Sequence, residues 1–115
     1  MKLLIAIIQP TKLQAVREAL YRMGVERMTV CDSQGYGRQR GQTATYRGIE
    51  YKVNMLRKVA LEIMVNDDFV ERTIETLLKV ARTGSDGQIG DGKIFILPAE
   101  ETVSIDSQLR GPGAV

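Results

Sequence analysis

The chain contains no histidine and no tryptophan, a single cysteine and few aromatic residues. Without histidine it lacks the commonest general base and the commonest zinc ligand of proteins. Hydrolase triads and thiol–imidazole pairs are therefore excluded as catalytic arrangements. Because aromatic residues make up only 5% and the net charge is only +2, we expect neither a base-stacking platform nor a basic nucleic-acid footprint.

The single cysteine, Cys31, cannot form an internal disulfide, which fits a reducing compartment. It lies in a strand-like run, so we expect a buried structural thiol. The apolar run from Leu3 to Ile8 is too short to span a membrane. One lysine precedes this run, Pro10 follows it, and no small-residue cleavage site is present. We interpret the run as a buried strand rather than a signal peptide, and we expect a cytoplasmic protein.

The length and the apolar pattern predict one soluble domain, residues 1–115, with the element order β-α-β-β-α-β. The predicted strands cover residues 2–9, 28–33, 59–65 and 93–97, and the predicted helices cover residues 12–23 and 69–82. Thr11 and residues 66–68 are expected to cap the helix N-termini, and Gly24 and Gly84 to follow the C-termini. Two helices on one face of a four-stranded sheet form an α+β, ferredoxin-like sandwich.

The connection between the second and third predicted strands, residues 35–55, is long, polar and marked by glycines. A connection of this length in a compact domain is usually functional or disordered. Its tyrosines and arginines favour a surface that contacts a partner. The glycine-rich start, Gly35 to Gly41, is either an ordinary strand exit or an anion-binding loop. It is not the dinucleotide fingerprint, because the spacing is wrong and no helix follows.

A second glycine-rich loop, Gly84 to Lys93, connects the second predicted helix to the last strand. Residues 87–93 match the G-x-x-x-x-G-K spacing, but Ile94 replaces the residue that should bind magnesium. The loop also runs from a helix into a strand, the reverse of a P-loop, so we reject that motif. It is either a plain turn or a phosphate cradle built from backbone amides and one lysine. Taken alone, Lys58 and Glu62 are expected to be solvent-facing or edge charges.

Three segments in order, GYGRQRG (35–41), YRGIEY (46–51) and IGDGKIF (89–95), together resemble the PII signal-transduction proteins of nitrogen regulation. The similarity runs from Met1 to about Leu97. The resemblance implies a ferredoxin-like homotrimer with three inter-subunit clefts. Those clefts would bind ATP or ADP and, together with Mg-ATP, 2-oxoglutarate. Residues 37–55 would be the family's T-loop, which docks into target proteins, and residues 99–115 a C-terminal tail.

The resemblance also implies roles for individual residues, none of them catalytic. The positions that match the family's nucleotide cleft are Ile7, Thr29, Gly35, Gly37, Arg38, Gln39, Glu62, Gly90, Asp91, Gly92 and Lys93. Gln39 and Lys58 match positions that bind 2-oxoglutarate, and Gln39 also matches the one that holds Mg²⁺ through bound ATP and 2-oxoglutarate. Arg47 matches the arginine that enters the pore of an ammonium transporter. Tyr51 matches the tyrosine that some members have uridylylated.

The chain departs from the family pattern in two places. The turn before Gly90 is three residues longer than usual and adds the acidic residue Asp86. The family commonly carries an arginine-x-arginine pair that reaches the nucleotide phosphates of a neighbouring subunit, and Ser104 and Asp106 stand there instead. Hydrogen bonds to charged groups contribute about 1.5–3 kcal/mol each. Their loss predicts weak ATP binding or a preference for ADP or AMP, with Arg110 as a candidate replacement.

These features favour a non-enzymatic sensor whose ligands bias the T-loop among conformations. Its expected partner is an ammonium transporter or another nitrogen-metabolism protein, with membrane contact only through such a transporter and no nucleic acid. One alternative is a divergent PII-like protein with ADP- or AMP-biased, or weak, nucleotide binding that regulates a different transporter or enzyme. A second is a small nucleotide-hydrolysing enzyme that uses Lys58, Lys93 and nearby carboxylates. A third is a structural interaction module with an empty cleft.

Overall fold

The computed structural model describes the backbone of residues 1–36, 43–46, 49–52 and 55–115, and the side chains of residues 1–35 and 56–115. Its helices and strands are, in order, β1 (Lys2–Ile8), α1 (Leu13–Arg22), β2 (Thr29–Tyr36), β3 (Thr43–Tyr46), β4 (Ile49–Lys52), β5 (Met55–Val65), α2 (Val70–Ala81) and β6 (Gly92–Pro98). Short 3-10 turns cover Pro10–Lys12, Asp67–Phe69 and Gly111–Ala114.

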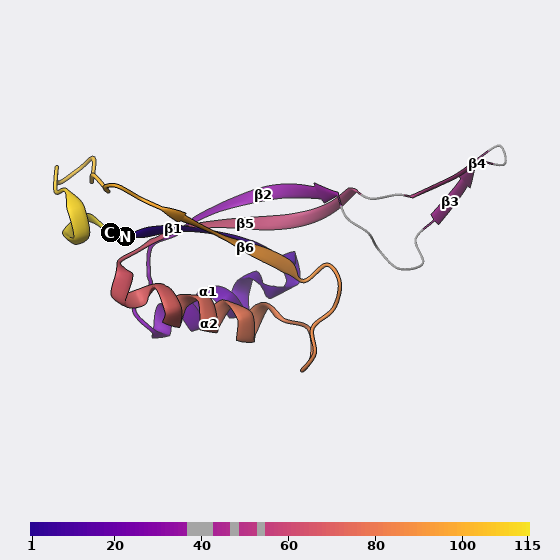
Figure 1. Cartoon of the computed structure of the whole chain (residues 1–115), viewed down its shortest axis with the longest axis horizontal. Coiled ribbons are helices and arrows are strands. Elements are labelled where there is room, and N and C mark those ends of the chain that lie inside the picture. Colours follow the sequence, from indigo (N-terminus) through magenta and orange to yellow (C-terminus); the bar gives the residue numbers. More distant parts are fainter. Residues whose placement is uncertain (37–42, 47–48, 53–54) are drawn as a thin grey trace.

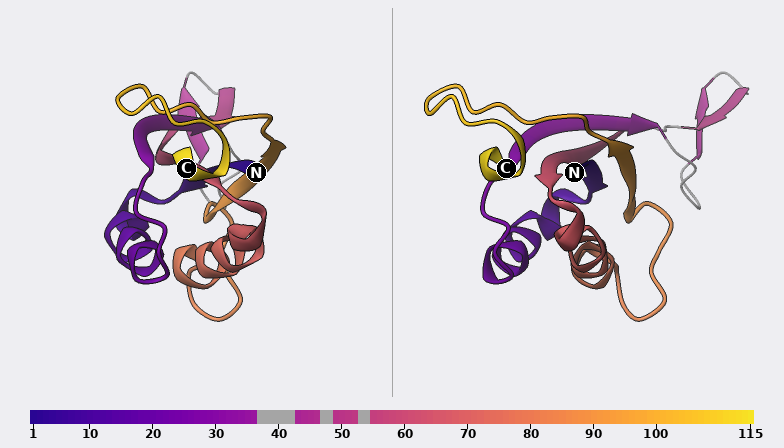
Figure 2. Two further views of the ribbon diagram at one scale, coloured as in Figure 1. Left: turned by 90° about the vertical axis from the view of Figure 1, so that its left-hand side faces the viewer. Right: turned by 60° about the vertical axis from the view of Figure 1, so that its left-hand side comes forward.

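The main sheet has the strand order β2-β5-β1-β6, and each neighbouring pair is antiparallel. Helices α1 and α2 both lie against one face of this sheet (Figures 1 and 2). The predicted β-α-β-β-α-β order and the α+β, ferredoxin-like arrangement are therefore confirmed. No helix in the described part of the chain is long and apolar enough to cross a membrane.

The core lies between the sheet and the two helices. Alternate residues of β1 and β5 point to this side, as the two-residue period of a strand requires. The buried set comprises Leu4, Ala6 and Ile8 of β1, Val59, Leu61, Ile63 and Val65 of β5, Val16 and Leu20 of α1, Val70, Leu77 and Ala81 of α2, and Val25 between α1 and β2. Leu3, Ile5 and Ile7, on the opposite face of β1, are partly buried. Apolar residues on both faces explain why the run reads as continuous.

The predicted capping residues do not cap the helices. Thr11 lies inside the first 3-10 turn, and neither α1 nor α2 has a side-chain cap at its N-terminus. A backbone hydrogen bond within the 3-10 turn precedes the helix instead: the Lys12 amide donates to the Gln9 carbonyl at 3.0 Å. The stop at Gly24 is confirmed: its φ is +96°, and its amide donates to the carbonyl of Tyr21 at 3.0 Å.

Not every apolar residue of α2 (Val70–Ala81) faces the sheet. Leu78 is 57% exposed, whereas Thr73 is fully buried. Leu78 follows the buried Leu77 by one position, which turns it about 100° away from the sheet. The Thr73 hydroxyl donates to the carbonyl of Phe69 at 2.7 Å, so a polar side chain is accommodated in the core.

The segment predicted as an irregular connection, residues 35–55, contains additional strand structure. β2 continues to Tyr36 and β5 already begins at Met55, because the two strands pair along their length from Thr29↔Glu62 to Tyr36↔Met55. Within the segment, β3 and β4 form a two-stranded antiparallel sheet. Backbone pairing of this kind carries no strong apolar signal, so the sequence pattern did not indicate it.

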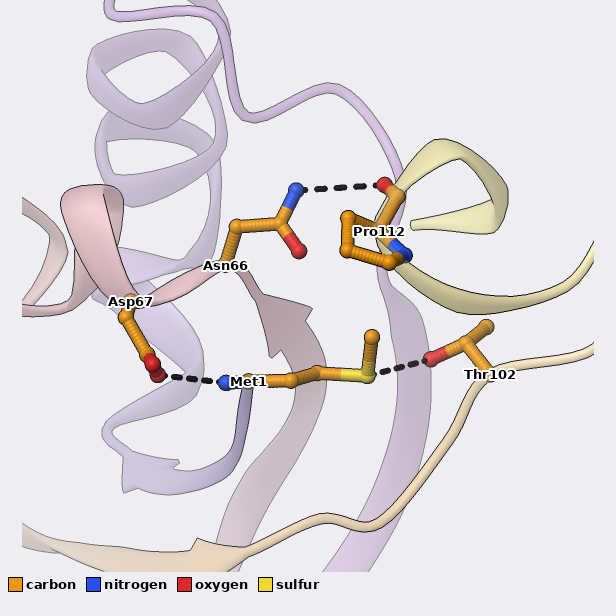
Figure 3. A network of polar contacts seen from close by, with 5 residues as sticks. All are labelled: Met1, Asn66, Asp67, Thr102 and Pro112. Atoms are coloured by element: carbon orange, nitrogen blue, oxygen red, sulfur yellow. Dashed lines mark hydrogen bonds and ion pairs between the residues drawn. The ribbon is translucent and has the colours of Figure 1, made fainter.

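Both chain ends lie at one end of β1 (Figure 1), and Figure 3 shows the polar contacts around Met1. The Met1 amine pairs with the Asp67 carboxylate, which lowers the pKa of Asp67 below its usual range. The Thr102 hydroxyl donates to the Met1 sulfur at 3.1 Å, and the Asn66 amide donates to the Pro112 carbonyl at 3.2 Å. The last two contacts join the C-terminal tail to the residues directly before β1 and directly after β5, although the tail shows no periodic pattern in the sequence.

Candidate functional site: the turn between α2 and β6

The turn between α2 and β6 is organised by the side chain of Asp91. Its carboxylate accepts hydrogen bonds from the Thr83 amide at 2.9 Å, the Thr83 hydroxyl at 2.6 Å and the Gln88 amide at 2.8 Å. These bonds lower the pKa of Asp91, and the bond from the Thr83 hydroxyl has the largest effect. The carboxylate is therefore charged at neutral pH and joins the two ends of the longer turn.

Two glycines let this turn approach the sheet closely. Gly90 has a φ of +99° and Gly92 a φ of +121°, values that L side chains rarely adopt. A Cβ added at Gly92 would lie 1.7 Å from the carbonyl oxygen of Ile7. Only glycine fits there, because β6 begins beside β1 with Gly92 opposite Ile8 and Lys93 opposite Ile7. Ile7, Gly92 and Lys93, which are predicted to belong to a nucleotide cleft, are thus brought together.

Lys58 points into the same turn rather than into solvent. It is only 7% exposed, which contradicts the expectation of a solvent-facing or edge charge. Its ammonium group donates to the carbonyl of Gly90, and the Gln9 side-chain amide donates to the same oxygen at 2.8 Å. Burial follows from the turn that covers this side chain, because Glu62, on the same strand and the same face of the sheet, is exposed. A Cβ at Gly35 would lie 3.6 Å from the Lys58 side chain, so Gly35 lies against its stem.

A cavity of about 480 Å³ lies between the end of α2, the turn and the start of β6. Its apolar residues are Ile7, Leu77, Leu78, Ala81, Ile89 and Ile94, and its polar and turn residues are Arg82, Asp86, Gly87, Gln88, Asp91, Gly92 and Lys93. Four predicted nucleotide-binding residues therefore line one cavity. The longer turn contributes Asp86, Gly87 and Gln88 to its wall.

Thr29 and Glu62 form a separate pair away from this cavity. They lie opposite each other on β2 and β5, and Cys31 donates to the Glu62 carboxylate at 3.5 Å. That hydrogen bond is the main reason why the pKa of Cys31 is raised. Cys31 is partly exposed rather than buried, since alternate residues of β2 face away from the helices. Neither Thr29 nor Glu62 lines the cavity at the turn of the same chain.

The remaining predicted positions lie in the long segment. Gly37, Arg38, Gln39 and Arg47 lie outside the described residues. The backbone of Tyr51 lies in β4 opposite Ala44, and its side chain is outside the described part.

Comparison with known proteins decides the family. The family model described as "Nitrogen regulatory protein P-II" matches residues 1–108. The chain belongs to the P-II family. It is 46% identical over 115 residues to "Nitrogen regulatory protein GlnK1" of Methanosarcina mazei, covering 100% of this chain and 97% of that protein. It is 47% identical over 115 residues to the P-II protein of Azospirillum brasilense, covering 100% of both chains. It is 48% identical over 105 residues to P-II 1 of Escherichia coli, covering 91% of both.

In this P-II chain, Asp106 and Arg110 of the C-terminal tail bond to other residues of the tail. Asp106 accepts hydrogen bonds from the Ser104 hydroxyl and from the Ser107 amide, and both lower the pKa of Asp106. Arg110 makes a two-point contact with Glu101, at 2.7 Å from Nε and 2.5 Å from Nη2. The guanidinium considered as a replacement for the family's arginine pair is therefore already paired within the chain.

Two residues that hold the turn between α2 and β6 were not predicted from the sequence. Gln9 and Thr83 supply donors to Gly90 and Asp91 from positions that are 81 and 8 residues away in the chain. The only signal for Gln9 was its place directly after the first apolar run. Thr83 precedes the glycine-rich turn, where a short hydroxyl side chain often bonds to nearby groups.

Proposed function

We propose that the chain is a homotrimeric PII-type sensor that binds adenine nucleotides in inter-subunit clefts. In this proposal 2-oxoglutarate binds together with Mg-ATP, and residues 37–55 act as the T-loop that regulates an ammonium transporter or another nitrogen-metabolism protein. The observation that carries the proposal is the turn at residues 83–92. The turn forms one wall of a cavity that Ile7 and Lys93 also line, and its Gly90 carbonyl accepts a hydrogen bond from the buried Lys58. Membership of the P-II family supports it, because the relatives are named regulatory proteins.

The cavity suits an adenine nucleotide in size and in chemistry. Its volume of about 480 Å³ falls in the range of ligand pockets, roughly 300–1,000 Å³. Leu77, Ala81 and Ile94 offer an apolar surface for a base, and Lys93 offers a cation for phosphate. The pair Thr29 and Glu62 lies elsewhere on the same chain, which is consistent with a cleft completed by a second subunit.

Lys58 suits the carboxylate of 2-oxoglutarate. It is a buried cation whose described partner is the neutral carbonyl of Gly90, and no ion pair of the described residues includes it. A buried charge is stabilised best by an opposite charge with hydrogen bonds. Mg²⁺ would enter with ATP, with Gln39 as its proposed protein ligand. No cluster of metal-ligating side chains occurs in the described part of the chain.

The tail supports a preference for ADP or AMP over ATP. Ser104 and Asp106 replace two cations, and the Arg110 guanidinium is held by Glu101. A carboxylate near the terminal phosphate would repel it, whereas a shorter nucleotide carries less charge to repel.

Calorimetric titration with ATP, ADP and AMP, with and without Mg²⁺ and 2-oxoglutarate, tests these proposals. We expect ADP to bind at least as tightly as ATP, with a weak response to 2-oxoglutarate. Sub-micromolar ATP binding with strong 2-oxoglutarate synergy would contradict the preference, and no binding of any adenine nucleotide would contradict the sensor itself. Lys93→Ala should weaken nucleotide binding, whereas Lys79→Ala, an exposed lysine on α2, is the matched control.

The partner and the absence of catalysis need separate measurements. A pull-down from native lysate, with and without ADP, should recover a partner that a variant lacking residues 37–55 does not recover. Arg47→Ala should reduce capture of an ammonium transporter, and mass spectrometry of native protein tests uridylylation of Tyr51.

A turnover assay at saturating nucleotide should show no appreciable hydrolysis. Sustained turnover that Lys58→Met or Lys93→Ala abolishes would favour an enzyme.

A further inference from the structure

Two donors from different strands converge on the carbonyl oxygen of Gly90. The Gln9 amide, just beyond β1, lies 2.8 Å from it, and the Lys58 ammonium group of β5 also donates to it. A Cβ placed on Gly90 would lie 3.5 Å from the Gln9 amide nitrogen and 3.7 Å from the Lys58 nitrogen. Both donors therefore lie beside this glycine. A carbonyl oxygen has two lone pairs, so it can accept both bonds at once.

The two donors differ in how readily they would leave. Lys58 is a buried cation, so an anionic ligand offers it a better partner than a neutral carbonyl does. Gln9 is uncharged and gains much less from an anion. An arriving carboxylate would therefore draw Lys58 away and leave Gln9 in place.

We propose that Gln9 is a positioning residue that holds Gly90, and with it the turn at residues 84–92, when Lys58 turns to a carboxylate ligand. The inference rests on the proposed function, in which that ligand is 2-oxoglutarate. With Gln9 present, the departure of Lys58 leaves the Gly90 carbonyl bonded. Without Gln9, the same departure leaves a part-buried acceptor with no partner, a loss that opposes ligand binding.

The position of Gly90 in the chain connects this role of Gln9 to the cavity that is proposed to bind the nucleotide. Asp91 and Gly92 follow directly and line the cavity, and the Asp91 carboxylate joins Gln88 to Thr83. Displacement of Gly90 would therefore move the wall against which the nucleotide binds. Gln9 keeps the wall in place while Lys58 changes partner, so both ligands can be bound together.

Calorimetry on the full chain separates this role from a general structural one. Gln9→Leu removes the donor at similar side-chain length, and Gln9→Lys restores an N–H donor. We expect Gln9→Leu to weaken 2-oxoglutarate binding at saturating Mg-ATP about tenfold, and Mg-ATP binding alone by less than about threefold. Gln9→Lys should recover 2-oxoglutarate binding. Gln14→Leu is the matched control, because the Gln14 amide bonds Glu18 on the surface of α1.

Unchanged 2-oxoglutarate binding in Gln9→Leu, or equal weakening of both ligands, would overturn the proposal. A ligand-free double-mutant cycle provides a second test that needs no 2-oxoglutarate. Gln9→Leu and Lys58→Met should each lower the unfolding midpoint slightly, and the double variant should lower it by more than the sum. Additive shifts would overturn the role of Gln9. Failure of the proposed function would instead appear as wild-type protein that binds neither ligand.

Discussion

Among the glycines that the structure describes, Gly92 has the least room for a side chain. A Cβ there would lie 1.7 Å from the Ile7 carbonyl oxygen and 2.8 Å from its carbonyl carbon, both backbone atoms. Ordinary contact begins near 3.4 Å. Since backbone atoms cannot rotate aside, Gly92→Ala must push the start of β6 away from β1, where Gly92 lies opposite Ile8.

The size of the effect can be estimated from two contributions. The backbone at Gly92, with a φ of +121°, is strained for alanine by about 1–3 kcal/mol. Separating the first rung of the β1–β6 ladder loses one or two hydrogen bonds, each worth about 0.5–1.5 kcal/mol net. Gly92→Ala should therefore destabilise the protein by about 1.5–6 kcal/mol. Gly84→Ala is the control, because Gly84 has a φ of +65° and nothing within 4 Å, so only about 1–2 kcal/mol is expected.

Urea unfolding followed by circular dichroism measures the difference. Both variants must be compared at one protein concentration, since assembly makes apparent stability depend on concentration. With a slope of roughly 2 kcal/mol per molar urea, Gly92→Ala should lower the midpoint by about 1 M or more. If it is no more destabilising than Gly84→Ala, the close approach of β6 to β1 is not what requires glycine, and the reasoning fails.

Three further predictions concern the core, the turn and the thiol. Leu61→Ala, at a fully buried site, should cost about 2–5 kcal/mol in urea unfolding, and Leu78→Ala, at an exposed one, within about 0.5 kcal/mol. The pKa of Asp91 is lowered in the fold, so its stabilisation is present above about pH 4 and lost as pH falls further; Asp91→Asn should lessen that loss. The pKa of Cys31 is raised mainly by Glu62, so Glu62→Gln should speed its alkylation near pH 8.

Distinct results would contradict each of these. Similar costs for Leu61→Ala and Leu78→Ala would place the core elsewhere. An acid profile unchanged by Asp91→Asn would mean that its three hydrogen bonds do not hold the carboxylate more tightly in the folded state. An alkylation rate that is unchanged or slower in Glu62→Gln would mean that Glu62 does not suppress thiolate formation at Cys31.

Local patterns sufficed for the order of the two helices and the four strands of the main sheet, but not for β3 and β4. Apolar runs of period two and stripes of period 3.6 report which faces are buried, and these are properties of neighbouring residues. Gly24 could be recognised as a helix stop for the same reason, because its positive φ belongs to one turn. The motifs at residues 35–41, 46–51 and 89–95 likewise indicated the P-II family before any contact was known.

The tertiary structure alone decided the contacts between segments that are far apart in the sequence. Nothing in the sequence near Lys58 shows that Gly90, 32 residues later, lies against its side chain, so its burial could not be read from local pattern. Gln9 acquires a role only because β1 ends beside the turn that begins more than 70 residues later. The need for glycine at position 92 likewise arises from the approach of the Ile7 backbone. Periodicity determines which face of a segment is buried, but packing determines which distant atoms meet there.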